Sequence, residues 1–343
     1  MIIFTCGGTG GHITPALNIA GQLQSEFLFI GGNRLEKELL KDVPFMEITT
    51  SPRNPLLILK GIRQALRILK NKKPKAVFST GGYVAFPVSI ASIILRIPLV
   101  LLEQNSIPGR VNRFLSPFAT LIFTGFPDFK KILPVKKTVC SGNPVASCAH
   151  LIRKKKNKVL VMGGSQGARK LNRTMLELLK LLPGEKLELI WLTGNKNYRE
   201  IENELEKMPG LSVQGQGSYL FDDIKIQLLP FHSKVTDMLP DIKFAISRAG
   251  AMSIAELTAY EIPAIYVPYP HAADNHQFYN AAFVTQKKGG VLLEDKDLTA
   301  QTLYDSLKIL MANYADFVHN LQVMNKTNAL TVIMLELAKR GLN

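Results

Sequence analysis

Residues 2–12 read IIFTCGGTGGH, a short apolar run followed at once by a glycine-rich loop. Residues 159–169 read VLVMGGSQGAR and repeat the same order of features in the second half of the chain. An apolar run that ends in glycines and leads into a helical pattern is typical of a buried strand, a tight loop and a covering helix. Because this pattern occurs twice, we expect two α/β domains in tandem.

Other apolar runs have the length of strands and alternate with helical patterns. They are residues 27–30, 76–79, 97–102, 187–192, 244–247 and 264–267. Such alternation predicts parallel sheets with helices on both faces. We therefore expect two Rossmann-like, doubly wound parallel-sheet domains that face an interdomain cleft. After the first glycine loop, Pro15 suits the first turn of a helix that continues through residues 18–23.

The composition is that of a globular protein that acts in a reducing compartment. The chain has 343 residues, of which 46% are hydrophobic and 20% are charged, and this length suits two domains. Cys6, Cys140 and Cys148 share no metal-ligand spacing and leave an odd thiol. No signal peptide is visible, and prolines interrupt the longest apolar stretch, residues 83–102, so we interpret it as a helix and a strand.

The net charge of +15 is concentrated in the first part of the chain. Residues 1–143 carry 18 Lys and Arg against 7 Asp and Glu. A basic excess of this kind often forms an ordinary solvated surface. Its concentration in one half nevertheless indicates a polyanionic partner for that half, either phosphate groups or anionic lipid.

The glycine loops are suited to phosphate but do not match two common nucleotide-binding motifs. Ile13 replaces the third glycine of the dinucleotide fingerprint, and the second strand ends in Gly31 and Gly32 where an acidic residue would bind ribose. The Walker pattern is also missing. These departures argue against an NAD-dependent enzyme and against a P-loop nucleotidase. Backbone amides of such loops, next to helix N-termini, can still hold a diphosphate.

Five motifs resemble those of the MurG family of bacterial peptidoglycan GlcNAc transferases, in the same order and over essentially the whole chain. They are residues 7–12 (GGTGGH), 80–83 (TGGY), 103–105 (EQN), 163–169 (GGSQGAR) and 248–256 (RAGAMSIAE). The resemblance implies the GT-B architecture. It also implies an inverting transfer of GlcNAc from UDP-GlcNAc to the C4 hydroxyl of MurNAc in the undecaprenyl-linked acceptor lipid I, which gives lipid II.

The resemblance implies three segments and their roles. Residues 1–152 would bind the acceptor and associate with the membrane, residues 153–325 would bind UDP-GlcNAc, and residues 326–343 would form a C-terminal helix that packs back on the first domain. It also implies donor-binding positions. These are Thr9, Gly10, Gly11, Asn105, Ser165, Gln166, Gly167, Phe231, His232, Ala251, Met252, Ser253, Ile254, Ala255, Glu256, His276 and Gln277.

Within this set, Ser165 and its loop would hold the diphosphate, and Glu256 would accept hydrogen bonds from the ribose hydroxyls. Phe231 and His232 match the uracil-binding pair, and Gln277 matches an amide that binds sugar hydroxyls. Ala146 stands where many members have an arginine that helps to hold the nucleotide, which indicates that one donor contact is lost or supplied by another group.

The acceptor side of the resemblance includes Gly8, Gly81, Gly82 and Tyr83. His12 matches the candidate catalytic base, and the alternative is that it only bonds loop backbone or acceptor phosphate. Glu103 could be the base instead, or could orient His12. No metal site is expected: Asp222-Asp223 and Asp295-x-Asp297 are interpreted as turns. No cofactor is expected beyond the donor substrate UDP-GlcNAc.

Residues 55–75 predict a basic amphipathic helix at the place of the family's membrane patch. The predicted patch consists of Leu56, Leu57, Lys60, Arg63, Arg67 and Lys70. The apolar residues predicted to face the core are Ile58, Leu59, Ile62, Ala65, Leu66 and Leu69. A basic amphipathic segment binds anionic bilayers, whereas the alternative is a solvated basic helix. We expect a peripheral protein on the cytoplasmic side of the bacterial membrane.

Expected partners are lipid I and an anionic membrane surface, and other cell-wall enzymes are a further suggestion of the resemblance. Two other classes stay open at this point. One is another UDP-sugar enzyme of the same architecture, such as a diacylglycerol glycosyltransferase or a UDP-GlcNAc epimerase, which would not need the N-terminal motifs. The other is a nucleic-acid-binding protein, against which the chain shows no aromatic RNA-binding motif and no helix-turn-helix pattern.

Overall fold

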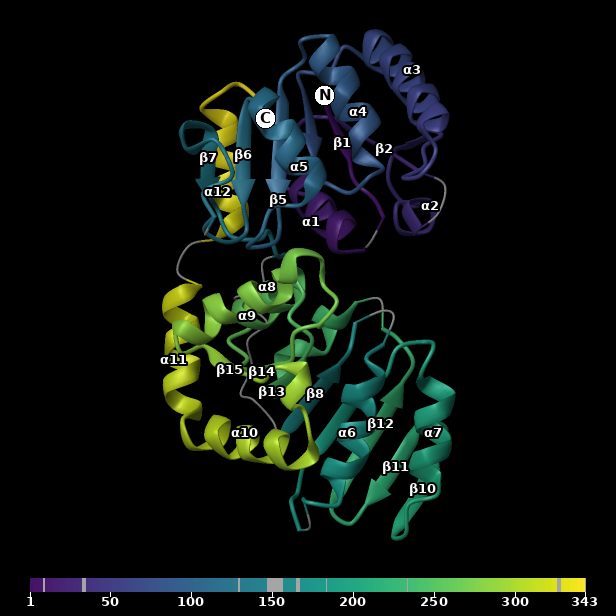
Figure 1. The fold of residues 1–343 in the computed structure, drawn as a ribbon, viewed down its shortest axis with the longest axis vertical. Coiled ribbons are helices and arrows are strands. Elements are labelled where there is room, and N and C mark those ends of the chain that lie inside the picture. The colour runs from purple at the N-terminus through teal and green to yellow at the C-terminus, as the bar shows by residue number, and fades with distance from the viewer. Residues whose placement is uncertain are drawn as a thin grey trace. The chain divides into compact units, whose positions relative to one another are not determined.

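The structure is a computed structural model that describes residues 1–8, 10–32, 35–128, 130–146, 157–164, 167–182, 184–232, 234–325 and 328–342. The chain divides into two compact units, each with its own sheet (Figure 1). The first unit comprises Met1–Ala146 together with Thr327–Asn343, and the second comprises Ser147–Lys326. The boundaries expected after residues 152 and 325 fall beside positions 151–156 and 326–327, which lie outside the described residues.

The first unit contains a seven-stranded sheet with the strand order β3-β2-β1-β4-β5-β6-β7. All of its strand pairs are parallel. The strands are β1 (Ile2–Thr5), β2 (Phe27–Gly31), β3 (Phe45–Glu47), β4 (Ala76–Ser79), β5 (Leu99–Glu103), β6 (Leu121–Thr124) and β7 (Thr138–Cys140). The order turns back at β1 and β4, so the carboxyl ends of these two strands form a switch point where ligands bind in such sheets.

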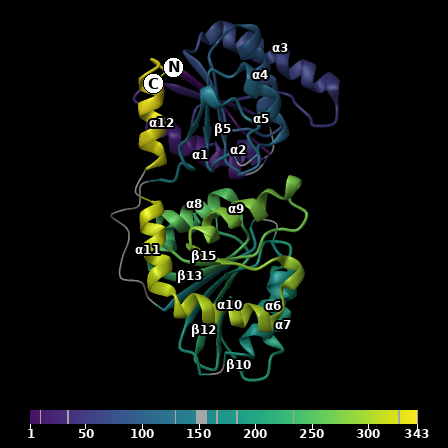
Figure 2. The same cartoon turned by 60° about the vertical axis from the view of Figure 1, so that its left-hand side comes forward.

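Helices cover both faces of the first sheet, and each face has its own apolar core. On one face, α1 (Gly10–Ala20) and the C-terminal α12 (Ala329–Ala338) pack against Phe4, Phe78 and Phe123. Figure 2 shows α12 beside α1, although the two are separated by most of the chain. On the other face lie α3 (Pro55–Lys72), α4 (Ala85–Ile94), α5 (Arg110–Leu115) and the 3-10 turn η1 (Ser116–Phe118). The short helix α2 (Leu35–Leu39) follows β2, and the 3-10 turn η2 (Val135–Lys137) precedes β7.

Two details of these helices differ from the sequence predictions. Helix α1 begins at Gly10, so Pro15 lies inside the helix and not in its first turn. The glycine loop is therefore shorter than expected, and His12 belongs to the first turn of the helix. In α3, Leu59 is exposed instead of facing the core, because the buried stripe runs through Gly61, Ala65 and Leu69.

The second unit contains an eight-stranded sheet with the order β10-β11-β12-β9-β8-β13-β14-β15. Its strands are β8 (Lys158–Met162), β9 (Glu188–Leu192), β10 (Leu211–Gly215), β11 (Ser218–Phe221), β12 (Ile224–Leu229), β13 (Ile242–Ser247), β14 (Ala264–Tyr266) and β15 (Gly290–Leu292). The sheet is parallel from β12 to β15. The pairs β10–β11 and β11–β12 are antiparallel, so the predicted parallel sheet continues into an antiparallel edge that the sequence analysis did not predict.

One face of the second sheet is covered by α6 (Arg169–Leu179), α7 (Tyr198–Glu206) and α10 (Ala300–Ala312), whose apolar side chains enclose Trp191. The remaining helices of the unit are α8 (Ala251–Ala259), α9 (His276–Gln286) and α11 (Tyr314–Met324). Short 3-10 turns are η4 (Val235–Asp237), η5 (Leu239–Asp241), η6 (Ala273–Asn275) and η7 (Asp295–Asp297). Across the described part of the chain, no helix combines the length and the apolar character needed to cross a bilayer.

Candidate functional site

The candidate site of the first unit lies at the carboxyl edge of the first sheet, where the loops after β1, β4 and β5 are neighbours. Strand β4 pairs with β1 on one side and with β5 on the other, and all three run in the same direction. The loops that follow these strands carry three of the five motifs, at residues 7–12, 80–83 and 103–105. Parallel pairing therefore brings together motifs that are up to 92 residues apart in the sequence.

His12 is held in a defined orientation by two of these loops. Its Nδ1 lies 2.8 Å from the backbone oxygen of Thr80 and 3.2 Å from Oε1 of Gln104. A carbonyl oxygen can only accept, so Nδ1 carries the proton and donates it to Thr80. The hydroxyl of Thr80 in turn donates to the backbone oxygen of His12, at 2.6 Å. When the ring is neutral, this leaves the lone pair on Nε2, which is then the basic nitrogen of the ring.

Gly81 and Gly82 pack directly beside the imidazole of His12. Both adopt positive φ, 90° and 83°. A Cβ on Gly81 would lie 3.5 Å from the His12 ring, and a Cβ on Gly82 would lie 2.2 Å from the backbone oxygen of Gly7. A side chain at Gly82 would thus collide with the first loop, and glycine allows the backbone to pack closely beside the ring of His12. Tyr83 lies next to Gly8, within 3.5 Å of where a Cβ on Gly8 would be.

Glu103 is buried and its carboxylate is occupied by its own loop. Oε1 accepts from the backbone nitrogen of Asn105 at 3.0 Å and from its side-chain amide at 3.4 Å. Oε2 accepts from the backbone nitrogen of Gly109 and from the side-chain amide of Asn112, both at 2.9 Å. The groups that orient His12 are Thr80 and Gln104. The four hydrogen bonds of the Glu103 carboxylate indicate that it shapes the 104–109 loop, and two of them hold Asn105.

Sequence reasoning missed Glu36, which lies under the first glycine loop. The Glu36 side chain is buried, and its Oε1 accepts from the backbone nitrogen of Gly8 at 2.6 Å. A Cβ on Gly7, Gly31 or Gly32 would come within 3.5 Å of this side chain, so the three glycines make room for it. The N–H of Gly8 is therefore engaged by a carboxylate in this structure. The sequence signal was the string of glycines at 7–8 and 31–32, which we interpreted only as loops.

The candidate site of the second unit lies at the carboxyl edge of the second sheet. Strands β12, β9, β8, β13, β14 and β15 are parallel neighbours, so the segments that follow them lie along the same edge. Gly164 and Gly167 turn the loop after β8 with φ values of 82° and 79°. A Cβ on Gly167 would meet Asn197 and the backbone of Thr193, which follow β9. The loop is thus packed against its neighbour and needs glycine at that position.

Helix α8 begins at this edge and presents its N-terminal backbone N–H groups there. Its N-cap is Gly250, which has no side chain to cap the helix, and Ala251, Met252 and Ser253 form the first turn. Their N–H groups make a favourable position for an anion. On the next turn, burial raises the pKa of the Glu256 carboxyl from 4.5 to about 7. Ile254 is buried and Ala255 half-buried.

The segment after β14 presents amide and imidazole groups near this helix. Oε1 of Gln277 accepts from the backbone nitrogen of Tyr269 at 2.9 Å, so its NH₂ group can donate to a ligand. His276 donates from Nδ1 to the backbone oxygen of Ala273 at 2.8 Å. The buried Asn280 donates to the backbone oxygen of Ala249 at 3.2 Å and so ties α9 to the start of α8.

The structure describes some of the remaining predicted donor positions but not all of them. Phe231 and His232 follow β12, and Phe231 is 48% exposed. Nδ1 of His232 accepts from the backbone nitrogen of Lys234. Gly10 and Gly11 lie in the first turn of α1. Predicted positions that lie outside the described residues are Thr9, Ser165 and Gln166.

The two aspartate pairs form turns, as the sequence analysis predicted. Asp222 and Asp223 connect β11 to β12, and Asp222 has a φ of 50°. Asp295 and Asp297 belong to the 3-10 turn η7. Within the described ranges, no three His, Cys, Asp or Glu side chains gather in a way that could hold a metal ion.

Two Rossmann-like units with phosphate-suited loops and an oriented histidine define the class of nucleotide-sugar glycosyltransferases. Residues 2–124 match the glycosyltransferase family 28 N-terminal domain, and residues 158–336 match the glycosyltransferase family 28 C-terminal domain. The chain belongs to glycosyltransferase family 28.

Individual relatives are similar over nearly their whole length. A UDP-N-acetylglucosamine–N-acetylmuramyl-(pentapeptide) pyrophosphoryl-undecaprenol N-acetylglucosamine transferase of Caldanaerobacter subterraneus is 36% identical over 345 residues, which covers 90% of each chain. The transferase of the same name from Bacillus subtilis is 33% identical and covers 91% of each chain. The crystal structure of MurG from Acinetobacter baumannii superposes with a TM-score of 0.79 at 28% identity, over 98% of this chain and 99% of that one.

Proposed function

We propose that this chain transfers N-acetylglucosamine from UDP-GlcNAc to the C4 hydroxyl of the MurNAc of undecaprenyl-diphospho-MurNAc-pentapeptide, with inversion at the anomeric carbon. The product is lipid II, a precursor of peptidoglycan. The observation that carries the proposal is that one chain holds both parts of the required chemistry. His12 is a histidine held in one orientation on the first unit, and Glu256 is a half-buried carboxyl beside an uncapped helix start on the second.

The second unit supplies the donor pocket in this proposal. The carboxylate of Glu256 accepts hydrogen bonds from the two ribose hydroxyls, which replace the water that burial has removed from it. The first turn of α8 and the loop after β8 hold the diphosphate through backbone N–H groups. The NH₂ group of Gln277 donates to a sugar hydroxyl, and Phe231 packs against uracil. These contacts leave the anomeric carbon as the reacting atom.

The first unit supplies the acceptor and the base. Nε2 of His12 removes the proton from the attacking C4 hydroxyl, while the carbonyl of Thr80 stabilises the imidazolium that forms through the Nδ1 proton. The bond from the sugar to the diphosphate breaks as the new glycosidic bond forms. The negative charge that develops on UDP is stabilised by the start of α8 and by loop amides, which are fixed before the reaction starts.

The proposed reaction is tested by transfer of radiolabelled GlcNAc from UDP-GlcNAc to a lipid I analogue, with and without EDTA. We expect a labelled lipid product in equal yield under both conditions, because the charge of the leaving group is met by the protein itself. Absence of lipid product in both conditions contradicts the proposal. Conversion of UDP-GlcNAc to an epimer without transfer would assign the chain to the epimerase class instead.

We further propose that the face of the first unit built by α3, α4 and α5 binds the cytoplasmic surface of an anionic bilayer. These helices cover the same face of the sheet. Their outward sides carry large apolar side chains that are each more than half exposed: Leu56, Leu59, Ile94, Phe114 and Phe118. Of the predicted patch, Leu56 and the four basic residues Lys60, Arg63, Arg67 and Lys70 are exposed, whereas Leu57 is partly buried. Exposed apolar groups with flanking cations suit an anionic interface.

The membrane proposal is tested by sedimentation with vesicles of phosphatidylglycerol or of phosphatidylcholine alone. Replacement of Lys60, Arg63 and Arg67 by Gln removes three cations, each worth about 1 kcal/mol near an anionic surface, so binding to the anionic vesicles should fall about 100-fold. The control carries the same charge change on exposed positions of the second unit, Lys180, Lys207 and Lys225 to Gln. Equal loss in both variants contradicts a specific face.

A further inference from the structure

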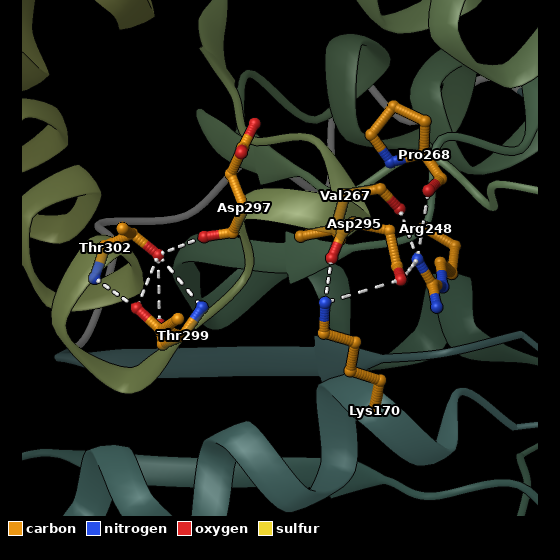
Figure 3. Close-up of polar contacts among 8 residues, drawn as sticks. All are labelled: Lys170, Arg248, Val267, Pro268, Asp295, Asp297, Thr299 and Thr302. Atoms are coloured by element: carbon orange, nitrogen blue, oxygen red, sulfur yellow. Dashed lines mark hydrogen bonds and ion pairs between the residues drawn. The ribbon is translucent and has the colours of Figure 1, made fainter.

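An arginine, an aspartate and a lysine meet at the carboxyl edge of the second sheet (Figure 3). We call Arg248, Asp295 and Lys170 the edge triad. One carboxylate oxygen of Asp295 lies 2.6 Å from a guanidinium nitrogen of Arg248, and the other lies 3.8 Å from the ammonium nitrogen of Lys170. Lys170 also donates to the backbone oxygen of Asp295. The side chains of Arg248 and Asp295 are only 10% and 13% exposed.

The edge triad ties together segments that follow different strands. Arg248 stands between β13 and the start of α8, Lys170 lies in the first turn of α6 after the glycine loop, and Asp295 follows β15. Arg248 also donates to the backbone oxygens of Val267 and Pro268, at 3.2 and 3.0 Å, which follow β14. Four neighbouring strand ends are thus held by one buried ion pair and its hydrogen bonds.

The segments held by the edge triad are those that carry the donor-site groups. Arg248 is two residues before Gly250, the N-cap of α8, and its guanidinium lies 5.8 Å from the ring centroid of Tyr269. The backbone nitrogen of Tyr269 is the partner of Gln277. A shift of Arg248 therefore moves both the start of α8 and the segment that positions Gln277.

The turn η7, which contains Asp295, is held by hydrogen bonds to the start of α10. The hydroxyl of Thr302 donates to the backbone oxygen of Asp297 at 2.7 Å, and Thr299 and Thr302 form a capping box at the start of α10 (Figure 3). The turn η7 is therefore fixed to a helix that packs on the core of the unit. Asp295 also lines a pocket of about 190 Å³ with Pro268, Asn275 and Phe278, next to the start of α9. Asp295 thus connects the start of α10, through η7, to the segments that Arg248 and Lys170 hold.

We propose that Asp295 is a positioning residue for UDP-GlcNAc: through Arg248 it sets the start of α8 and the 267–269 segment in the geometry that binds the donor. The inference rests on the proposed function of the second unit. The carboxylate neutralises a guanidinium that is buried, and a buried cation without its partner draws water or other acceptors toward itself. The backbone segments that Arg248 holds then lose their fixed position, and a displacement of about 1 Å in a binding site is enough to weaken it.

The test compares Asp295→Asn with a control at the opposite edge of the same sheet. Asn keeps the shape of the side chain but removes its charge. The control is Glu188→Gln, which breaks the ion pair of Glu188 with Lys158, 2.9 Å long, at the first residues of β8 and β9. Titration calorimetry with UDP-GlcNAc measures donor binding directly, and steady-state kinetics gives KM for donor and for acceptor.

We expect Asp295→Asn to raise the dissociation constant of UDP-GlcNAc about tenfold, because the guanidinium of Arg248 loses its ion-pair partner. The acceptor KM should stay unchanged, and Glu188→Gln should bind the donor as the wild type does. Asp295→Glu should recover part of the affinity. A lower Tm with an unchanged dissociation constant overturns the inference, as does an equal loss in the control.

A second variant keeps the inference testable if Asp295→Asn does not fold. The side chain of Lys170 is 44% exposed, so Lys170→Gln should fold, and it removes one of the two cations that fix Asp295. We expect about threefold weaker donor binding, and unchanged binding overturns the inference. If the wild-type chain does not bind UDP-GlcNAc at all, the proposed function fails. If the wild type binds and both variants bind equally well, only the role of Asp295 fails.

Discussion

The protonation of Glu256 gives a quantitative test of the donor pocket. Burial raises the pKa of this carboxyl from 4.5 to about 7, which corresponds to about 3 kcal/mol of unfavourable free energy for the ionised form in the free protein. Ribose hydroxyls donate hydrogen bonds to a carboxylate, so only the ionised form binds UDP-GlcNAc with full strength. At pH 6 about one molecule in ten carries the ionised form, and at pH 8 about nine in ten do.

The dissociation constant of UDP-GlcNAc should therefore rise about tenfold between pH 8 and pH 6, because only the competent fraction binds. Glu256→Gln should bind about 10- to 100-fold more weakly at pH 8, the size of one charge-assisted hydrogen bond, and should lose this part of the pH dependence. Calorimetry at pH 6, 7 and 8 measures both effects. The difference between wild type and variant isolates the part of the pH dependence that Glu256 contributes.

The pH dependence of the stability of the free protein is an independent test of the raised pKa of Glu256. Below pH 4.5 the carboxyl is protonated in the folded and the unfolded chain, so its contribution to stability is fully present. Between about pH 4.5 and 7 the unfolded chain loses the proton first, so the free energy of unfolding falls by about 3 kcal/mol. Glu256→Gln should lack this fall in chemical denaturation. Equal pH dependence of binding in both proteins would refute the reasoning.

Three further predictions concern the first unit. His12→Gln should lower turnover by about 10²- to 10⁴-fold with an unchanged KM for UDP-GlcNAc, and unchanged turnover at saturating substrates removes it as the base. Glu103→Gln should lower the free energy of unfolding by about 2–3 kcal/mol, because it places an amide against donors that a carboxylate now satisfies; a loss of rate with wild-type stability would instead indicate that Glu103 is the base. Gly82→Ala should lower both stability and turnover, since its Cβ would collide with backbone beside His12; wild-type values in thermal unfolding and in the transfer assay would contradict the packing of this loop.

Much of the fold could be predicted because its signals are local. Apolar runs and glycine loops located eight of the strands to within a residue or two, including β1 and β8. The antiparallel β10 and β11 were not predicted, since β10 is largely exposed and the apolar run of β11 is only three residues long. The start of α1 was placed too late because Pro15 dominated the interpretation, whereas the helix accommodates it in its interior.

The site could be predicted only as separate motifs. The pairing of His12 with Thr80 and Gln104 depends on the adjacency of β1, β4 and β5, which a single sequence does not reveal. Glu36 was missed because a buried acidic residue under a glycine loop looks like any charged helix residue in the sequence. Asp295 was interpreted as part of a turn, which is correct, but its ion pair with Arg248 joins residues that are 47 positions apart.

A crystal structure with bound UDP tests the assignment of the second unit most directly. The account predicts ribose oxygens within about 2.6–3.2 Å of the Glu256 carboxylate, and phosphate oxygens facing the first turn of α8. A nucleotide bound elsewhere, or a ribose that does not reach Glu256, would contradict it.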